Sequence, residues 1–438
     1  FSSTYSNDGS VIYLSTGGIA NSLAVENCKF ISNSSKGGGV CIKSQYPSHI
    51  TEITNTVFVD NQCLITASPG VATGVIYTEQ SSLMKVINCT FKNNTGSYSS
   101  DYYPIYYNPY NGTYDFYLIN TIFWGNRGNS QVRTVRFILD PSNKLHYYQC
   151  CVEGGLGTCA PDSFGIDEDP CFVELTGQEG TIGFDSSCLD VGLSSLPGFT
   201  ISSTDISGAD RSSVYNDGNL DGTGGYDIGA YEIITAPSYV SGDIASFIST
   251  NPNSIYFVLT QSAYLNQTVN ISNRRIAITS GNLDGTGKNY RFLNITNNSD
   301  VLIKDTGIVY FTNNFNGSAI CAANSRIHVE GVYCLYNEGN IGGVMYLDNC
   351  HGTITSSNFL WNSSNSHAGA VYLSSCPSFI VDASCFEYNT SGGHTGAVCV
   401  TNGDYSFNDC IFLSNSAPNS DTGALRATLY SGDRKSVV

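Results

Sequence analysis

A short internal repeat with a nearly constant step is the feature that most restricts how this sequence can fold. Glycine-led units of the type Gly-Ala-Val begin at Gly343, Gly369, Gly396 and Gly423, in steps of 26, 27 and 27 residues. A second unit, Phe-x-x-Asn, begins at Phe30, Phe58, Phe91, Phe123, Phe311, Phe359, Phe386 and Phe412, with Cys334 as a variant. A period of about 20 to 50 residues is typical of solenoids, in which each repeat packs against the next.

One repeat has room for strands but not for helices. Segments such as Ser378–Asp382 alternate apolar and polar residues and are bounded by Asn, Ser and Gly, which is typical of short strands. Three such strands with their turns fill one period, so the coils are expected to stack about 4.8 Å apart. The sequence therefore predicts an all-β fold, a parallel β-helix.

The repeated residues have expected roles in such a coil. The Phe of each unit would point inward and stack on the Phe of the next coil. The Asn would lie in a turn, where its amide can bond backbone groups or the next Asn and where the left-handed conformation costs it little. The Gly would allow a tight bend where a side chain would clash.

Composition excludes several other classes of protein. Only 13% of the residues are charged, which argues against helical solenoids and coiled coils. The 19 basic and 36 acidic residues give a net charge of −17, so nucleic acid is not an expected partner. No apolar run approaches the roughly 18 residues of a membrane span, so no membrane insertion is expected within this sequence.

The repeats also carry a resemblance to a known family. Paired Phe-x-x-Asn and Gly-Gly-Ala-Val/Ile units resemble those of polymorphic outer-membrane proteins and related right-handed β-helix surface proteins of the pectin-lyase-like superfamily. Residues 243–278 resemble the capping helix and first strands of such proteins, and residues 166–173, 187–192 and 227–232 resemble their closing segments. The resemblance implies a right-handed parallel β-helix. It implies little about function, because the superfamily includes lyases, hydrolases, adhesins and spacers.

A closing segment that ends near residue 232 and a new cap that begins near residue 243 divide the chain into two tandem β-helices. Residues 1–235 are expected to form the C-terminal part of a first β-helix, with its closing segment at about 160–235, and residues 236–430 the cap and coils of a second. Both are expected to be truncated, so that the intact protein is longer. Residues 433–438 look like a translated sequencing adapter and are left out of the fold prediction; a natural basic tail is the alternative.

The cysteines indicate an oxidising compartment. Sixteen cysteines without a Cys-x-x-Cys pair favour disulfides and secretion over zinc binding. Cys350 and Cys376 fall one coil apart in matching register and are predicted to form a disulfide. Cys385 and Cys410 form a second predicted pair, although their spacing of 25 shifts the register by one. The alternative for such stacked cysteines is a ladder of free thiols.

One segment offers candidate ligands for a metal ion. Asp217, Asn219 and Asp221 follow the pattern of the first half of a calcium loop. Ile228 occupies the position where such a loop carries its last glutamate, and only the neighbouring Asp227 could substitute for it. Runs of Asp, Asn and Gly are also ordinary turn chemistry. The cofactor prediction is therefore none, with Ca²⁺ at Asp217, Asn219, Asp221 and Asp227 as the one candidate.

No catalytic residue is predicted. The Asn-Thr-Asp, Asp-Asp, Gly-His-Gly and Arg-Ile-Lys motifs of polygalacturonases are absent, and the scattered basic residues have no acidic partner group such as a pectate-lyase site needs.

Sequons for N-glycosylation are numerous, although their number is scarcely above chance in so Asn- and Ser-rich a sequence. They lie at Asn33, Asn88, Asn93, Asn111, Asn266, Asn270, Asn294, Asn297, Asn316, Asn362 and Asn389. At Asn362 and Asn389 the sequon coincides with the repeat Asn, where stacking is an alternative role.

Together these features predict an extracellular or cell-surface scaffold or adhesin that contacts glycans or surface proteins through its solenoid faces. A tyrosine-rich run at 98–117 is either an exposed surface that stacks on sugars or a coil of irregular composition. One alternative function is a pectin-lyase-like polysaccharide lyase or hydrolase. Another is a purely structural spacer or fibre subunit.

Overall fold

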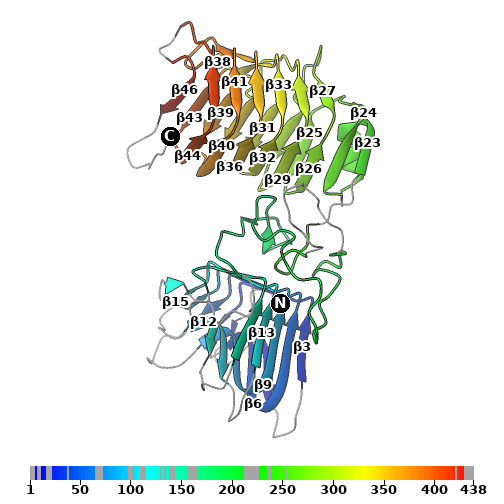
Figure 1. The fold of residues 1–438 in the computed structure, drawn as a ribbon, viewed down its shortest axis with the longest axis vertical. Helices are drawn as coiled ribbons and strands as arrows, with labels where there is room; N and C mark the ends of the chain where they lie inside the picture. Colours follow the sequence, from blue (N-terminus) through cyan, green and yellow to red (C-terminus); the bar gives the residue numbers. More distant parts are fainter. Residues whose placement is uncertain are drawn as a thin grey trace. The chain divides into compact units, whose positions relative to one another are not determined.

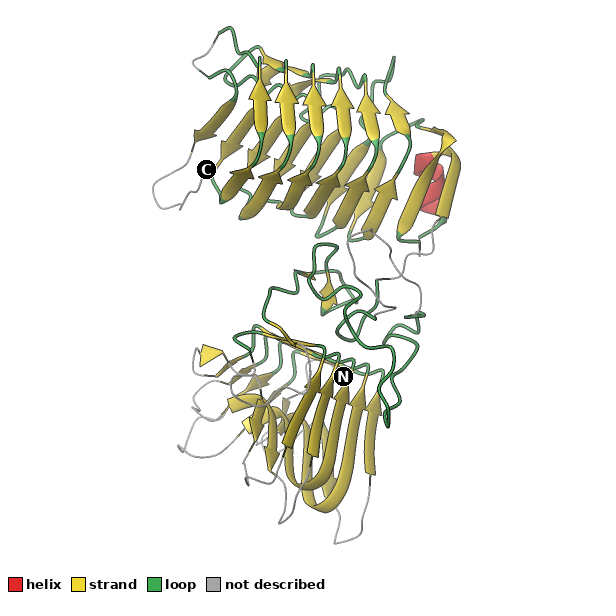
Figure 2. Cartoon of the chain, viewed as in Figure 1, coloured by secondary structure: helices red, strands yellow, loops and turns green. Residues whose placement is uncertain are grey.

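The computed structural model describes residues 5–6, 11–15, 22–36, 39–64, 73–96, 102–108, 115–128, 131–132, 135–137, 144–155, 165–211, 226–233, 238–252, 254–419 and 422–428. The chain divides into two compact units, Phe1–Ile234 and Thr235–Val438, here called unit 1 and unit 2 (Figure 1). Both units consist of stacked short strands, and α1 (Ile244–Thr250) is the one helix within these ranges (Figure 2). The predicted Asn111, Asp217, Asn219, Asp221 and residues 433–438 lie outside the described residues.

Unit 2 is a parallel β-helix whose coils contribute one strand to each of three long sheets and, in the middle coils, one to a short fourth sheet. In spatial order the first sheet contains β23 (Ser238–Asp243), β24 (Tyr256–Tyr264), β26 (Arg275–Thr279), β29 (Asp300–Lys304), β32 (Arg326–Glu330), β36 (His351–Thr355), β40 (Ser378–Asp382) and β44 (Tyr405–Asn408). The second sheet contains β25 (Val269–Ser272), β28 (Leu293–Thr296), β31 (Ile320–Ala323), β35 (Met345–Asp348), β39 (Val371–Ser374), β43 (Val398–Thr401) and β46 (Leu425–Thr428). The third sheet contains β27 (Asn282–Asp284), β30 (Gly307–Val309), β33 (Tyr333–Leu335), β37 (Asn358–Leu360), β41 (Cys385–Glu387) and β45 (Ile411–Leu413). The fourth sheet contains β34 (Glu338–Ile341), β38 (Ser363–His367) and β42 (Thr390–Ser391).

The first coil of unit 2 is covered by α1. Asp243 caps this helix by accepting a hydrogen bond from the Ser246 amide, which satisfies one of the free donors at a helix start. Ile244 and Ile248 are buried and join the same apolar core as Phe257 of β24. A short helix followed by the strands β24, β25 and β26 is the arrangement that the resemblance implied for residues 243–278.

Unit 1 contains the same kind of coil. Its first sheet contains β4 (Lys29–Ile31), β7 (Val57–Val59), β10 (Thr90–Lys92), β14 (Ile122–Trp124), β19 (Cys150–Val152) and β20 (Gly165–Ile166). Its second contains β1 (Tyr5–Ser6), β5 (Ser34–Ser35), β8 (Gln62–Cys63), β11 (Thr95–Gly96), β15 (Arg127–Gly128) and β16 (Gln131–Val132). Its third contains β2 (Ile12–Ser15), β3 (Ser22–Glu26), β6 (Gly39–Thr54), β9 (Thr73–Ile87), β12 (Tyr102–Asn108), β13 (Asp115–Ile119), β17 (Val135–Phe137) and β18 (Lys144–Tyr148). A hairpin of β21 (Phe172–Val173) and β22 (Thr181–Ile182) follows.

The tyrosine-rich run contributes a strand of this stack. Strand β12 pairs in parallel with β9 and β17. Tyr102 and Tyr107 are fully buried, and Tyr106 stacks on Tyr77 with 4.9 Å between ring centroids. Within residues 102–108 the run is therefore a coil of irregular composition and not an exposed platform.

The predicted phenylalanine stack is confirmed. In unit 1 the rings of Phe30, Phe58, Phe91 and Phe123 are buried and nearly parallel, with successive centroids 5.0, 4.6 and 4.6 Å apart. The prediction is wrong at Phe311. Strand pairing places Ile308 in the column of inward residues. Phe311 occupies the position of the repeat Asn, and its backbone amide donates to the Asn337 Oδ1 at 3.0 Å.

The repeat asparagines form a buried ladder between coils. In unit 2 the Asn362 side-chain amide donates to the Asn389 Oδ1 at 3.0 Å and to the Cys334 carbonyl at 3.1 Å. The Asn337 backbone and side-chain amides donate in turn to the Asn362 Oδ1 at 3.0 and 2.9 Å. The left-handed conformation was expected at the repeat Asn itself, but the residue before it adopts that conformation. Trp361, which precedes Asn362, has a φ of 56°.

The repeat glycines are needed for close approach and not for a bend. A Cβ built on Gly369 would lie 2.2 Å from the Gly396 carbonyl oxygen of the next coil. Backbone atoms cannot move away cheaply at that distance, so a side chain at Gly369 would force the stacked coils apart.

The described cysteines are all free thiols, so neither predicted disulfide is formed in this structure. Cys350 and Cys376 are buried one coil apart, and burial raises the pKa of the first thiol to about 12 and of the second to about 11. The two cysteines lie in the turns between β35 and β36 and between β39 and β40, and their thiols donate to the carbonyls of Asp348 and Ser374. Cys385 pairs with Ile411, so Cys410 stands one position away from it.

The described sequons fall into two groups. Asn33, Asn88, Asn362 and Asn389 are fully buried, so their amides cannot accept a glycan while the coils are folded. Exposed sequons lie at Asn93, Asn266, Asn270 and Asn297, and half-buried ones at Asn294 and Asn316.

Candidate functional site

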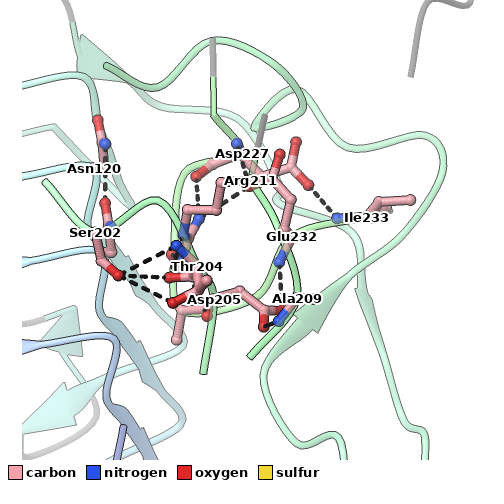
Figure 3. A network of polar contacts seen from close by, with 12 residues as sticks. Asn120, Ser202, Thr204, Asp205, Ala209, Arg211, Asp227, Glu232 and Ile233 are labelled. Carbon is pink, nitrogen blue, oxygen red and sulfur yellow. Dashed lines mark hydrogen bonds and ion pairs between the residues drawn. The ribbon is translucent and has the colours of Figure 1, made fainter. Parts of the chain in front are cut away.

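The closing segment of unit 1, here residues 165–211 and 226–233, packs on the outer face of the first sheet. Ala230 and Tyr231 join Val57 and Val59 in a small apolar cluster. The Ala230 amide donates to the Thr90 Oγ1 at 3.0 Å. Residues 230–231 of the closing segment are thus held against strands β7 and β10. The same segment contains a network of polar contacts (Figure 3).

Arg211 is the centre of that network and is fully buried. Its guanidinium donates to the Glu232 Oε2 at 3.0 Å and to the carbonyl oxygens of Gly229 and Ala230, both at 3.0 Å. It also donates to the carbonyls of Thr204 and Asp227 at 3.3 Å, and it lies 3.4 Å from the Asn55 Oδ1 of the coil. Arg211 therefore links Thr204 and residues 227–232 of the closing segment to Asn55 of the β-helix.

The carboxylates around Arg211 bind backbone amides of the segment. Asp227 accepts from the amides of Asp190 at 2.9 Å and Ile233 at 2.7 Å. Glu232 accepts from the Asp227 amide at 3.0 Å, and Asp205 accepts from the Glu232 amide at 3.1 Å (Figure 3). These bonds supply partners for backbone groups of a segment that has little regular structure of its own.

Three of the acids lie close enough together to bind one metal ion. Ligand atoms of Asp190, Asp227 and Glu232 lie within 4.8 Å of one another, and all three residues are buried. Asp227 is the one member of the predicted calcium loop that the structure describes, so the loop stays a prediction. Arg211 already supplies one positive charge to this cluster, and the carboxylates of Asp227 and Glu232 already accept hydrogen bonds from backbone amides.

The cluster changes the proton affinity of Glu232. Burial, together with the charge of Asp227, raises the pKa of Glu232 to about 10, and Arg211 only partly offsets this. A single guanidinium cannot neutralise three buried carboxylates, so a proton held by Glu232 lowers the cost of burying them.

We expect unit 1 to lose stability as the pH rises. Glu232 holds its proton in the folded chain, but in the unfolded chain it releases the proton near the ordinary pKa of about 4.5. The free energy of unfolding is therefore highest below that pH and falls progressively as the pH rises toward the pKa of the folded chain. From pH 6 to pH 7 the free energy of unfolding should fall by about 1.4 kcal/mol relative to Glu232→Gln, which mimics the protonated acid. The measurement is urea unfolding followed by Trp124 fluorescence in a Trp361→Phe background. Parallel pH profiles for the two proteins would contradict the expectation.

A second candidate, which the sequence analysis did not find, lies on unit 2. Here the third-sheet face means the outward residues of β27, β30, β33, β37, β41 and β45 and the residues at their two corners. Half of the fourteen exposed large apolar or aromatic side chains in the described residues lie on it. They are Tyr310, Tyr333, Tyr336, Trp361, Tyr388, Ile411 and Leu413.

Four of these rings form a column at one corner. Tyr310, Tyr336, Trp361 and Tyr388 are 37–50% exposed and stand in successive coils, each in the left-handed conformation. Centroid distances along the column are 5.5, 6.4 and 4.3 Å, and the first and last pairs are within 13° of parallel. Exposed stacked rings are a costly arrangement for a surface in water, which favours an interaction site.

The sequence signal for this column is the residue before the repeat Asn. It is aromatic at Tyr336, Trp361 and Tyr388, whereas the corresponding residues of unit 1 include Ser32 and Asp60. The periodicity gave no reason to treat that position as outward, because its direction depends on the left-handed turn.

Comparisons with known proteins do not place the chain in a family. No protein-family model and no curated protein matches the sequence. Among the described residues, no helix is long and apolar enough to span a membrane.

Proposed function

We propose that the protein is a non-catalytic scaffold or adhesin at a cell surface or outside the cell, which contacts a macromolecular partner through the third-sheet face. The observation that supports this most strongly is the exposed column of Tyr310, Tyr336, Trp361 and Tyr388. A rigid β-helix holds such a column without further ordering cost, and aromatic residues are the side chains that contribute most to binding at interfaces.

The resemblance to right-handed β-helix surface proteins supports the same proposal, because contact is the usual task of extended solenoid faces. The buried carboxylates of the closing segment do not favour the enzyme alternative. Asp227 and Glu232 are 2% and 6% exposed and bind amides and Arg211, so they are poorly placed to exchange protons with a substrate.

The test is retention of the whole chain on defined surfaces. The purified protein is incubated with immobilised neutral and acidic polysaccharides and with immobilised extracellular proteins, with and without Ca²⁺, and the products are examined for new reducing or unsaturated ends. We expect retention without turnover, and loss of retention in the double variant Trp361→Ser, Tyr388→Ser. Serine suits these positions, because Ser32 and Ser414 occupy equivalent left-handed positions.

Tyr239→Ser is the matched control, since Tyr239 is 64% exposed but lies on β23, away from the third-sheet face. Turnover of a polysaccharide would overturn the proposal in favour of a pectin-lyase-like enzyme. No retention on any surface would favour a structural spacer.

A further inference from the structure

The third-sheet face combines apolar side chains with negative charge. Four acidic residues stand on it or on its corners, Asp284, Asp305, Glu387 and Asp409, and Glu338 stands beside it as the first residue of β34. No lysine or arginine stands at any position of its six strands or of the two corners, and the adjoining Lys304, at the end of β29, is ion-paired with Glu330 at 3.1 Å. All five acids are exposed or half-buried, so their field reaches an approaching partner.

The rings of the column are not arranged as sugar-binding platforms. A sugar ring binds an aromatic side chain through the face of that ring, where the negative π cloud meets its C–H groups. Trp361 and Tyr388 lie 4.3 Å apart at 10°, so each covers a face of the other. One face of each of these two rings is therefore closed to a ligand, which makes a glycan the less suitable occupant.

The residues beside the column point to a protein partner. Ile411 and Leu413 of β45 are 58% and 47% exposed, and Tyr333 of β33 is 41% exposed. Asn358 stands next to Tyr333 in its column, and Glu387 stands between Leu360 and Leu413, so apolar and polar side chains alternate on this face. Apolar and aromatic side chains among polar and charged ones are typical of protein interfaces. A second copy of the same face is disfavoured, because five carboxylates would meet five carboxylates.

We propose that the third-sheet face docks a protein segment that combines apolar side chains with lysine or arginine. This rests on the proposed function and deepens it by naming the chemistry of the partner. The aromatic column supplies the buried contacts and therefore slows dissociation, and the five acids steer the basic residues and fix their register.

The experiment uses a displayed library of random dodecapeptides as the probe, selected against the whole chain, with the Trp361→Ser, Tyr388→Ser variant for counter-selection. We expect enriched peptides to combine lysine or arginine with aromatic or aliphatic residues. A synthetic enriched peptide should bind the double variant about tenfold more weakly or worse, and Tyr239→Ser like the unmodified chain. In Glu338→Gln, Glu387→Gln the affinity should fall about two- to fivefold at low salt, and the difference should shrink at high salt.

Several results would overturn the inference. They are an absence of enriched peptides, enriched peptides without basic residues, binding that the double variant leaves unchanged, and self-association of the chain that the double variant abolishes. The failure of this inference is distinct from the failure of the proposed function. Retention on neutral polysaccharides alone, lost in the double variant, would overturn the protein partner and leave the contact role of the face intact.

Discussion

Replacing Arg211 by alanine is expected to destabilise unit 1 by about 3 to 5 kcal/mol. The substitution removes the one cation beside the buried Asp227 carboxylate and removes the donors to Glu232 and to the carbonyls of Gly229 and Ala230. A buried charge that loses its countercharge is costly because it cannot reach water. Urea unfolding followed by Trp124 fluorescence, in a Trp361→Phe background, measures the loss in unit 1.

Two comparisons make this result specific. Arg211→Lys should be destabilised nearly as much, because an ammonium group cannot reproduce the planar set of donors that meets several oxygen acceptors at once. Unit 2, followed by Trp361 in a Trp124→Phe background, should unfold as before, because the network lies within unit 1. A fully stable Arg211→Ala protein, or rescue by lysine, would show that the network does not hold the closing segment.

The second large effect is expected from Asn362→Ala in the buried ladder of unit 2. Its side chain accepts from the backbone and side-chain amides of Asn337 and donates to Cys334 and Asn389. Alanine leaves the Asn337 backbone amide and the Cys334 carbonyl without these bonds, while the Asn337 side chain keeps the Ile308 carbonyl and Asn389 keeps the backbone amide of residue 362. Each buried group left unsatisfied costs about 1 to 3 kcal/mol. We expect a loss of about 4 kcal/mol, measured by urea unfolding with the adjacent Trp361 as the reporter in a Trp124→Phe background.

The matched control is another asparagine pair between coils. Asn294 on β28 donates to the Asn270 Oδ1 at 3.1 Å, but this pair is exposed to solvent. Asn294→Ala should therefore change the free energy of unfolding by less than about 0.5 kcal/mol. Equal losses for the two variants would mean that burial does not decide the strength of the ladder.

Much of the fold could be predicted from the repeat because both its period and its residue types are local properties of the chain. A step near 26 residues leaves room for three strands, and a Phe at each step must share one column when the coils stack. This reasoning located Phe58 and Phe91 correctly. It failed at Phe311, where the same letters occur three residues out of register and strand pairing places Ile308 inward.

The candidate sites could be predicted much less well. Asp227 was chosen as a metal ligand because it adjoins the last ligand position of the loop that begins at Asp217, yet its carboxylate accepts from the amides of Asp190 and Ile233. The roles of Arg211 and Glu232 depend on contacts with Asn55 and with each other, across separations that no local pattern records. The cysteine spacing placed Cys350 and Cys376 in equivalent turns of successive coils, but both are free thiols.

The sequence by itself determined the coil, since a regular spacing of Phe, Asn and Gly leaves a parallel β-helix as the one arrangement that buries and pairs all of them. Only the tertiary structure decided which residues face outward at the corners and what lies over the sheets. The left-handed residue before each repeat Asn turns Trp361 and Tyr388 to the surface. The closing segment brings Arg211 to carboxylates and to Asn55 from elsewhere in the chain. Both outcomes depend on backbone direction and on long-range contacts, which composition and spacing do not encode.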